Sequence, residues 1–223
     1  MRLRDYQTTL GRALCGSSTL DAKGGERPSD GRAPLDTVLA STGFAFTRCI
    51  QRSWCEGRVS LLAKRTLSAL PRARRKALID AWVDRGGGRG AFGAEEAIAF
   101  LQFIADDLRN DPAAFYWCRI EQAIYRAALG RETFVPKAWP NNHMTLLNRA
   151  GHATLVTHPN DWPFNEPPLL FAPGLPNLVR EARPVECMLW EKLKTAKPVG
   201  VFSNTAYVAT LSTMLVEGIL THT

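Results

Sequence analysis

The sequence lacks the short motifs that mark common catalytic sites. No GxSxG, HExxH, GxxxxGK[ST] or paired CxxC pattern occurs in its 223 residues. It also lacks the run of about 18 apolar residues that a membrane span needs. Its first fifteen residues lack the uninterrupted apolar segment and the cleavage site of a secretion signal. We therefore expect a cytoplasmic protein without a membrane partner, and these motifs assign no catalytic residue.

Histidine is scarce, and three of the four histidines lie within sixteen residues. These three are His143, His152 and His158. Their spacings of nine and six match no zinc or non-haem iron pattern on a helix. We therefore expect no metal in this chain, and we expect His152 and His158 to contact a partner.

Cysteine is also scarce, odd in number and scattered along the chain. In a reducing compartment most cysteines are small buried hydrophobic residues. Cys118 lies in the middle of a predicted helix, whereas Cys187 lies near a helix start, which can lower the pKa of a thiol. Packing is the favoured interpretation of both. An independent enzyme that uses Cys187 or the histidine cluster stays an alternative that nothing in the sequence requires.

Basic residues account for the net charge of +7, and they are concentrated in one stretch. Between Arg48 and Arg89, eleven Lys and Arg face three acids, a net +8. Such a patch fits nucleic acid, an acidic peptide or an acidic protein surface, or it is a solvated helix face. A winged-helix-like C-terminus would favour DNA binding. However, the segment Thr205–Leu220 holds no Lys or Arg, so DNA binding is kept only as the alternative.

Apolar residues recur at helical spacing through the first part of the chain. The predicted helices cover residues 3–15, 36–55, 60–70, 71–85, 94–110 and 111–129. Residues 16–34 are rich in Gly, Ser, Pro and charge, and they are predicted to form a mobile loop. The glycine-rich segment 86–93 follows a helix rather than a strand, so the sequence predicts a helix end and not a phosphate-binding loop. Residues 1–133 are therefore predicted to form a helical domain.

The helix predicted at 111–129 has two distinct faces. Its apolar face carries Trp117, Ile120, Ile124 and Ala128. A second face carries Arg119, Gln122 and Arg126 at positions i, i+3 and i+7. We expect this polar face to take part in a partner interface.

Proline is concentrated in the C-terminal part of the chain, because nine of the fourteen prolines lie between Pro136 and Pro184. Long helices cannot form there. Short strands are predicted at residues 153–157, 169–172, 178–182 and 199–202, and helices at 185–195 and 205–215. The fold class is therefore α+β: an N-terminal helical bundle, then a small C-terminal open sheet with helices over residues 134–223.

A small open sheet has exposed edges, and an exposed edge can accept an extended peptide as an added strand. The residues predicted to bind such a peptide lie on two candidate strands. They are Leu169, Leu170 and Phe171 on one, and Val199, Val201 and Phe202 on the other. Strand order cannot be read from the sequence, so both sets stay open.

Three segments, taken in order, resemble a known family. They are LRDYQTTLGRAL (residues 3–14), CRIEQAIYRAAL (118–129), and ARPVECMLWEKL with TLSTMLVEGIL (182–220). Together they resemble the HvfC-type proteins, in particular the MbnC branch that serves methanobactin biosynthesis, a ribosomal peptide (RiPP) route to copper acquisition. The resemblance covers about a third of the chain, and its motifs are short patterns with few fixed positions. The extended 16–34 loop and the tryptophan-rich connection 135–164 depart from the family pattern.

The resemblance implies a non-catalytic partner subunit of a heterodimer. The other subunit would be an MbnB-like TIM barrel that holds several irons, so iron is expected in the partner and no cofactor in this chain. The N-terminal helices would dock on that enzyme. The C-terminal sheet would hold the leader of a cysteine-containing precursor peptide, whose cysteines the complex would oxidise with dioxygen to oxazolone and thioamide groups.

Overall fold

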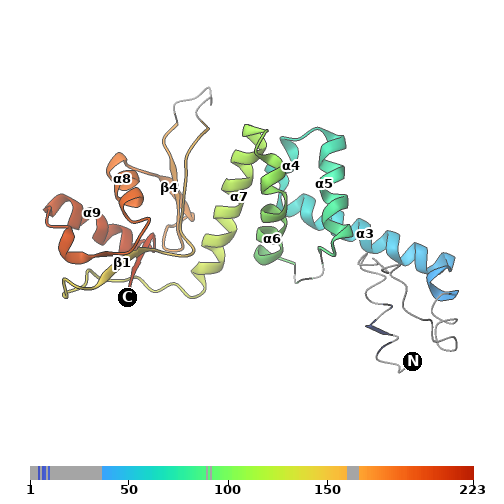
Figure 1. Ribbon diagram of the computed structural model, residues 1–223, viewed down its shortest axis with the longest axis horizontal. Helices are drawn as coiled ribbons and strands as arrows, with labels where there is room; N and C mark the ends of the chain where they lie inside the picture. The colour runs from blue at the N-terminus through green and yellow to red at the C-terminus, as the bar shows by residue number, and fades with distance from the viewer. Residues whose placement is uncertain are drawn as a thin grey trace, which may run out of the picture. The chain divides into compact units, whose positions relative to one another are not determined.

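The computed structural model describes residues 37–88, 90, 92–159 and 166–223, together with Asp5, Gln7, Thr8 and Leu10, which are helical. The rest of the predicted helix 3–15, the predicted loop 16–34 and the predicted cap at Asp36 lie outside the described residues. The fold is α+β, with helices in the N-terminal part and strands in the C-terminal part (Figure 1). This confirms the predicted class. The chain divides into two compact units, Met1–Ile104 and Ala105–Thr223.

The first unit is helical. Its helices are α3 (Thr42–Leu62), α4 (Lys64–Ser68), α5 (Arg72–Asp84) and α6 (Ala94–Ala105). The hydroxyl of Ser41 begins α3 by accepting the backbone N–H of Phe44 at 3.2 Å. The prediction of two helices with a gap after residue 55 is wrong, because α3 continues to Leu62. Val59 and Leu62 extend the buried face that Cys55 begins, and this packing outweighs the cost of Gly57 inside the helix.

Glycines end α5 as predicted, and an arginine braces the loop that they form. Gly86 and Gly88 have φ angles of 85° and 78°, which favour glycine. The Arg58 guanidinium donates to the Gly90 carbonyl oxygen at 2.8 Å and pairs with the carboxylate of Glu96. Glu96 is buried, and a buried carboxylate needs such a partner. The loop therefore has a structural explanation.

The three acids of the basic stretch all gather around Arg52. Its guanidinium lies 2.6 Å from Asp80, 2.9 Å from Asp84 and 3.6 Å from Glu56. The hydrogen bond from Arg52 is the main cause that lowers the pKa of the Asp80 carboxyl. These contacts join α3 to α5.

The second unit begins with a short 3-10 turn (η1, Asp106–Leu108) and the long helix α7 (Pro112–Arg131). The side chain of Asp111 accepts the N–H of Ala114 at 3.2 Å, and Pro112 occupies the first turn. α7 packs on β2 and β3, so it belongs with the sheets of the second unit. The sequence analysis placed the domain boundary between residues 133 and 134, just after the end of α7. The two compact units of the structure meet before α7, between Ile104 and Ala105.

Two small antiparallel sheets follow α7. One has the order β5–β1–β6 and consists of β1 (Leu146–Arg149), β5 (Lys197–Pro198) and β6 (Leu220–His222). The other has the order β2–β3–β4 and consists of β2 (Thr154–Val156), β3 (Leu169–Phe171) and β4 (Val179–Glu181). The predictions of β2, β3 and β4 are confirmed. The strand predicted at 199–202 is wrong, because Val199–Val201 form a 3-10 turn (η2) directly after β5.

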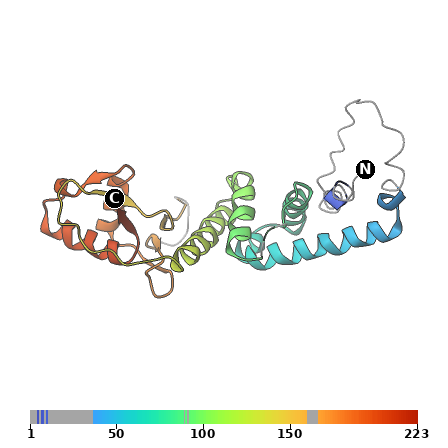
Figure 2. The same cartoon turned by 90° about the horizontal axis from the view of Figure 1, so that it is seen from below.

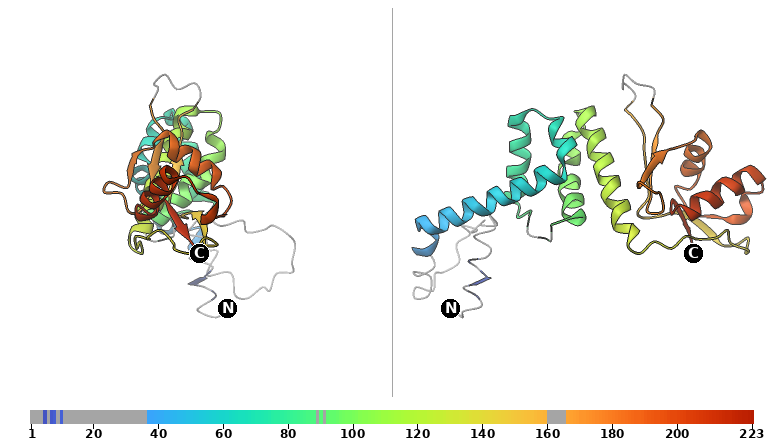
Figure 3. Two further views of the ribbon diagram at one scale, coloured as in Figure 1. Left: turned by 90° about the vertical axis from the view of Figure 1, so that its left-hand side faces the viewer. Right: turned by 180° about the vertical axis from the view of Figure 1, so that it is seen from behind.

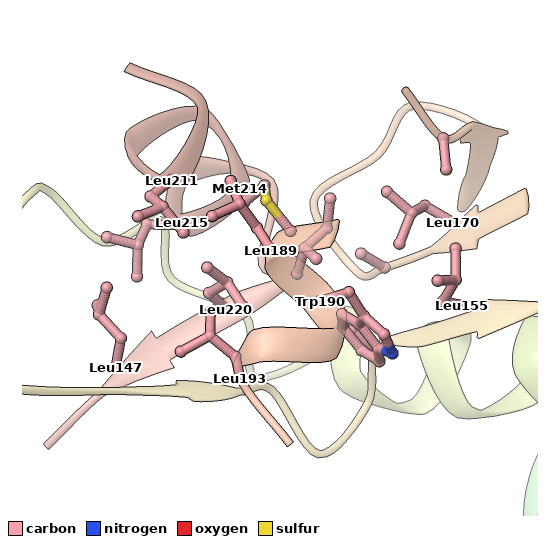
Figure 4. Packing of buried hydrophobic residues seen from close by; sticks show 14 of the residues in the cluster. Leu147, Leu155, Leu170, Leu189, Trp190, Leu193, Leu211, Met214, Leu215 and Leu220 are labelled. Atoms are coloured by element: carbon pink, nitrogen blue, oxygen red, sulfur yellow. The ribbon is translucent and has the colours of Figure 1, made fainter. Parts of the chain in front are cut away.

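The helices α8 (Pro184–Lys192) and α9 (Thr205–Val216) complete the unit. Side chains alternate across the sheet β2–β3–β4. Val156 and Phe171 face α7, where they pack on its apolar residues. Leu155 and Leu170 face the other way, into the core that α8, α9 and the first sheet build (Figure 4). The ribbon seen from behind shows α7 on one side of the sheet β2–β3–β4 and α8 and α9 on the other (Figure 3). The sheet is therefore covered on both faces, and only its edges are left for an added strand.

Candidate functional site

The two sheets have four edge strands, and their hydrogen-bond patterns decide which edge is open. In an antiparallel sheet, successive residues of an edge strand direct their N–H and C=O groups alternately toward the neighbouring strand and away from it. Proteins blunt such edges with charged side chains or proline. A charged side chain caps one outward carbonyl on β2, on β6 and on β4, and a proline blunts β5.

The edge of β2 is capped by α7. Thr154 pairs with Phe171, and Val156 with Leu169, so Leu155 directs its carbonyl away from β3. The Arg119 guanidinium donates to this carbonyl oxygen at 3.3 Å. An incoming strand at β2 would have to displace Arg119.

Both edges of the first sheet are also blunted. The carbonyl oxygen of His222, which points away from β1, accepts a hydrogen bond from the Lys137 ammonium at 3.0 Å. The same ammonium donates to the hydroxyl of Thr221 at 2.8 Å. On the opposite edge, the residue of β5 that points outward is Pro198, which has no N–H to offer.

The edge of β4 offers two outward backbone N–H groups. Hydrogen bonds from Ala182 N–H to the Pro168 carbonyl (2.7 Å) and from Ala172 N–H to the Leu178 carbonyl (3.0 Å) fix the register with β3. Val179 and Glu181 therefore direct their backbone groups away from β3. The Glu181 carbonyl accepts from Arg180 at 2.9 Å. Within the described residues, neither outward N–H is hydrogen-bonded.

A buried charge network holds β4 in place. The Arg180 guanidinium binds the carboxylates of Glu186 at the start of α8 and Glu217 at the end of α9. Burial raises the pKa of the Glu186 carboxyl, but hydrogen bonds from Arg180, from the Arg183 side chain and from the Arg183 N–H outweigh it and lower the pKa to about 2. Glu186 is therefore ionised at neutral pH, and the open edge is anchored to two helices.

The sequence did not predict this network. Arg183-x-x-Glu186 before an apolar helix is a usable signal, because a glutamate at the third helical position accepts the N–H of the residue that precedes the helix. That bond is present at 2.8 Å. Arg180 and Glu217 lie far apart in sequence, so only the fold could bring them to Glu186.

In the structure, the residues predicted to bind a peptide do not lie on an open edge of either sheet. Leu169, Leu170 and Phe171 form β3, which pairs with β2 on one side and β4 on the other. Its backbone groups are therefore already used. At the other candidate strand, Val199 and Phe202 are buried at a 3-10 turn, while Val201 is exposed. Because β3 is a central strand, the edge that remains as a candidate is that of its neighbour β4.

The residues predicted for the partner interface are spread along α7. Arg119 caps β2, whereas Gln122 and Arg126 are half-exposed on the same helix. His158 packs on the ring of Tyr116 and lies 3.1 Å from its hydroxyl. His152 lies instead against Gly130, where a Cβ atom would come within 2.6 Å of the histidine Cβ.

These contacts separate the two histidines. Tyr116 and Gly130 are fourteen residues apart on α7, which is about 21 Å along the helix axis. His158 also lies 3.5 Å from the carboxylate of Glu166. Across the described ranges, no group of three or more His, Cys, Asp or Glu side chains is arranged to hold a metal ion. The expected contacts of these residues with a partner stay a prediction.

Neither cysteine weighed as a nucleophile has a lowered pKa. Burial is the main cause that raises the pKa of the Cys118 thiol, to about 12, and Glu121 adds to it. Burial also raises the pKa of the Cys187 thiol, and the carboxylate of Glu186 acts in the same direction. The position of Cys187 near the start of α8 thus does not produce a thiolate.

Comparison with known proteins adds no assignment. No protein-family model matches the sequence, and no curated protein matches it either. In the part of the chain that the structure describes, no helix has the length and apolar character to cross a membrane.

Proposed function

We propose that this chain is a non-catalytic partner subunit that holds a ribosomal precursor peptide by strand addition at the edge of β4. The outward N–H groups of Val179 and Glu181 carry the proposal. Among the described residues no strand pairs with the outer edge of β4, and Glu181 on that edge is exposed. On the other edges, Leu220 of β6 is buried, Arg119 caps β2, and Pro198 of β5 has no N–H. A backbone ladder of this kind gives affinity for an extended segment.

Selectivity would come from the two faces of the added strand. Residues of the peptide that point toward α7 would lie beside Val179, which is half-buried against that helix. Residues that point the other way would lie beside Arg180, whose charge Glu186 and Glu217 already neutralise. We therefore expect apolar side chains at alternate positions of the bound segment.

The wider assignment rests on the resemblance to HvfC-type proteins. Two of the segments that carry it, residues 118–129 in α7 and 182–193 around α8, supply helices on opposite faces of the sheet β2–β3–β4. In this proposal the enzyme is an MbnB-like iron protein in the same cytoplasmic complex. Its irons and dioxygen carry the oxidation of peptide cysteines, and no step of that chemistry falls to residues of this chain.

One experiment tests the edge directly. The probe is a fluorescein-labelled version of the small cysteine-containing peptide encoded beside the gene, and anisotropy measures its binding to the complex. Glu181→Pro removes one outward N–H, and proline is tolerated on an edge strand. Glu181→Ala removes only the side chain and is the matched control. We expect at least about tenfold weaker binding for the proline variant, the equivalent of one lost hydrogen bond and a distorted ladder.

Equal affinity of the two variants would exclude β4 as the binding edge. The partner assignment has its own test, which is metal analysis of the chain purified alone and after co-expression with its genomic neighbours. Iron that appears only in a co-purified complex supports the proposal. Stoichiometric metal in the isolated chain would support an independent enzyme, and DNA binding that falls steeply with salt would support the DNA-binding alternative.

A further inference from the structure

The outer face of α3 is apolar and exposed, although the opposite face already packs into the core of the first unit. Phe46, Ile50, Trp54 and Leu61 are 66%, 45%, 70% and 71% exposed. We call these four residues the α3 stripe. A surface helix normally carries polar residues opposite its buried face, so the stripe calls for an explanation. Figure 2 shows α3 as one continuous helix along this length.

The stripe is continuous and free of charge. At 3.6 residues per turn, its four side chains fall within an arc of about 80° on the helix. Gly43 and Gly57 share this arc, and the residues that border it are Thr47, Ser53, Arg58 and Ser60. Given the usual areas of such side chains, the exposed part of the stripe amounts to roughly 500 Å². A patch of that size and character is typical of an interaction site rather than of a solvated surface.

We propose that two copies of this chain associate through their α3 stripes, with the helices antiparallel. The twofold axis passes between Ser53 and Trp54, the centre of the stripe. Residues at equal distances from this centre then face one another. Trp54 of each copy meets Ser53 of the other, and Ile50 meets Gly57.

The stripe is self-complementary in this arrangement, because large side chains meet small ones at its centre. A Cβ atom at Gly57 would have no heavy atom within 4 Å, so the position is open and can receive Ile50 of the second copy. At the two ends Phe46 meets Leu61, and two apolar side chains close the contact. Such a pattern is expected of a surface that binds its own copy, since a different partner would not require residues matched about a centre.

The charge and the area also fit a second copy. Two stripes bury roughly 1,000 Å² together, which is near the lower limit for a specific interface. No charged residue has to be desolvated in the stripe itself. Arg52 lies on another face of α3 and is paired by Asp80, and Arg58, which borders the stripe, is already paired within the unit by Glu96. We therefore expect a dimer of micromolar strength, and this expectation does not depend on the proposed peptide site.

Light scattering coupled to gel filtration tests the dimer on the full chain, over about 1 to 100 µM, a range that brackets a micromolar dissociation constant. The wild-type chain is expected to approach twice its mass of 24.7 kDa. Trp54→Glu and Gly57→Glu should each return it to the monomer mass, with unchanged circular dichroism because both positions are exposed. Ser68→Glu, at an exposed position of α4, is the control and should remain dimeric.

Disulfide trapping tests the antiparallel direction. In a Cys49→Ser background, Ser53→Cys should crosslink two copies on mild oxidation, because residue 53 lies beside the twofold axis. Ser60→Cys should not crosslink, because residue 60 faces Thr47 of the other copy. The two cysteines introduced at position 60 would then lie about 20 Å apart along the helix axis. A wild-type chain that stays monomeric at 100 µM overturns the proposal. The stripe would then be covered by residues before 37 or by a different protein. Equal crosslinking of both variants would overturn the antiparallel arrangement.

Discussion

The guanidinium of Arg180 and the carboxylate of Glu186 form two parallel hydrogen bonds, 2.8 Å from Nη1 to Oε2 and 2.7 Å from Nη2 to Oε1. The Glu186 side chain is fully buried, whereas that of Arg180 is 26% exposed, so water cannot take the place of Arg180 on the buried carboxylate. The pair connects the edge strand β4 to the first turn of α8. If β4 receives a peptide as proposed, the strand must keep its own position, and this pair would hold it there.

Replacing Glu186 by glutamine should destabilise the protein in a pH-dependent way. The pKa of Glu186 is about 2 in the folded chain, against 4.5 for an ordinary glutamate. A lowered pKa stabilises the fold above pH 4.5, and this stabilisation is lost as the pH falls from 4.5 toward 2. We expect Glu186→Gln to lower the free energy of unfolding by about 3 kcal/mol at pH 7, and by much less near pH 2.

Urea unfolding at pH 7 and at pH 3, followed by circular dichroism, measures this effect. The control is Glu191→Gln on the same helix, because the Glu191 side chain is 56% exposed and pairs only at the surface. Its effect should be small at either pH, because ion pairs at the surface contribute little to stability. A similar loss of unfolding free energy in both variants would mean that the buried pair contributes no more to stability than a surface pair.

Gly88→Ala should be strongly destabilising. Gly88 has a φ of 78°, and a Cβ atom there would come within 2.5 Å of the Cys55 Sγ atom. Backbone strain and overpacking together should cost about 2 to 4 kcal/mol. Gly90→Ala is the matched control from the same loop, because a Cβ atom at Gly90 meets no heavy atom within 4 Å. Thermal unfolding should show a clear drop in Tm for the first variant and little change for the second.

Local patterns predicted most of the helices and three of the strands, because each such element carries its own signal. Asp111-Pro112 marks the start of α7, and short apolar runs mark β2 and β3. The signal failed where an element depends on distant partners. β1 and β6 are the clearest cases: Leu146 and Thr223 pair with each other at 3.2 and 3.3 Å, yet neither segment is strand-like alone.

The sequence predicted that a small sheet is present, but it could not predict how the strands are ordered within it. The structure has two small sheets of three strands each. Which edge is open depends on strand order and on side chains that reach across the fold, such as Arg119 over Leu155. Neither property is encoded in the residues of one strand. For the same reason, the central strand β3 was mistaken for an edge.

Removing the cap on β2 should weaken the fold slightly. Arg119→Met keeps the length of the side chain but leaves the Leu155 carbonyl without its donor at 3.3 Å. We expect a loss of about 1 kcal/mol in the free energy of unfolding, the usual value of such a hydrogen bond. Arg126→Met on the same helix is the control. The measurement is the urea midpoint of each variant, and equal midpoints would show that the cap at β2 is not stabilising.

The cysteines should react with a thiol reagent in an order that their surroundings set. Cys49 is exposed, whereas Cys55 and Cys118 are buried. Because the pKa of Cys118 is about 12, the thiolate that attacks the reagent is rare at pH 8. Cys187 is half-buried with a raised pKa, so it should react more slowly than Cys49 but faster than the buried pair. Labelling the native chain with a disulfide reagent, followed by mass spectrometry of its peptides, gives the order. If Cys187 reacted before Cys49, its thiol would be activated in a way that these surroundings do not provide, and the cysteine-dependent enzyme would become the better explanation of this chain.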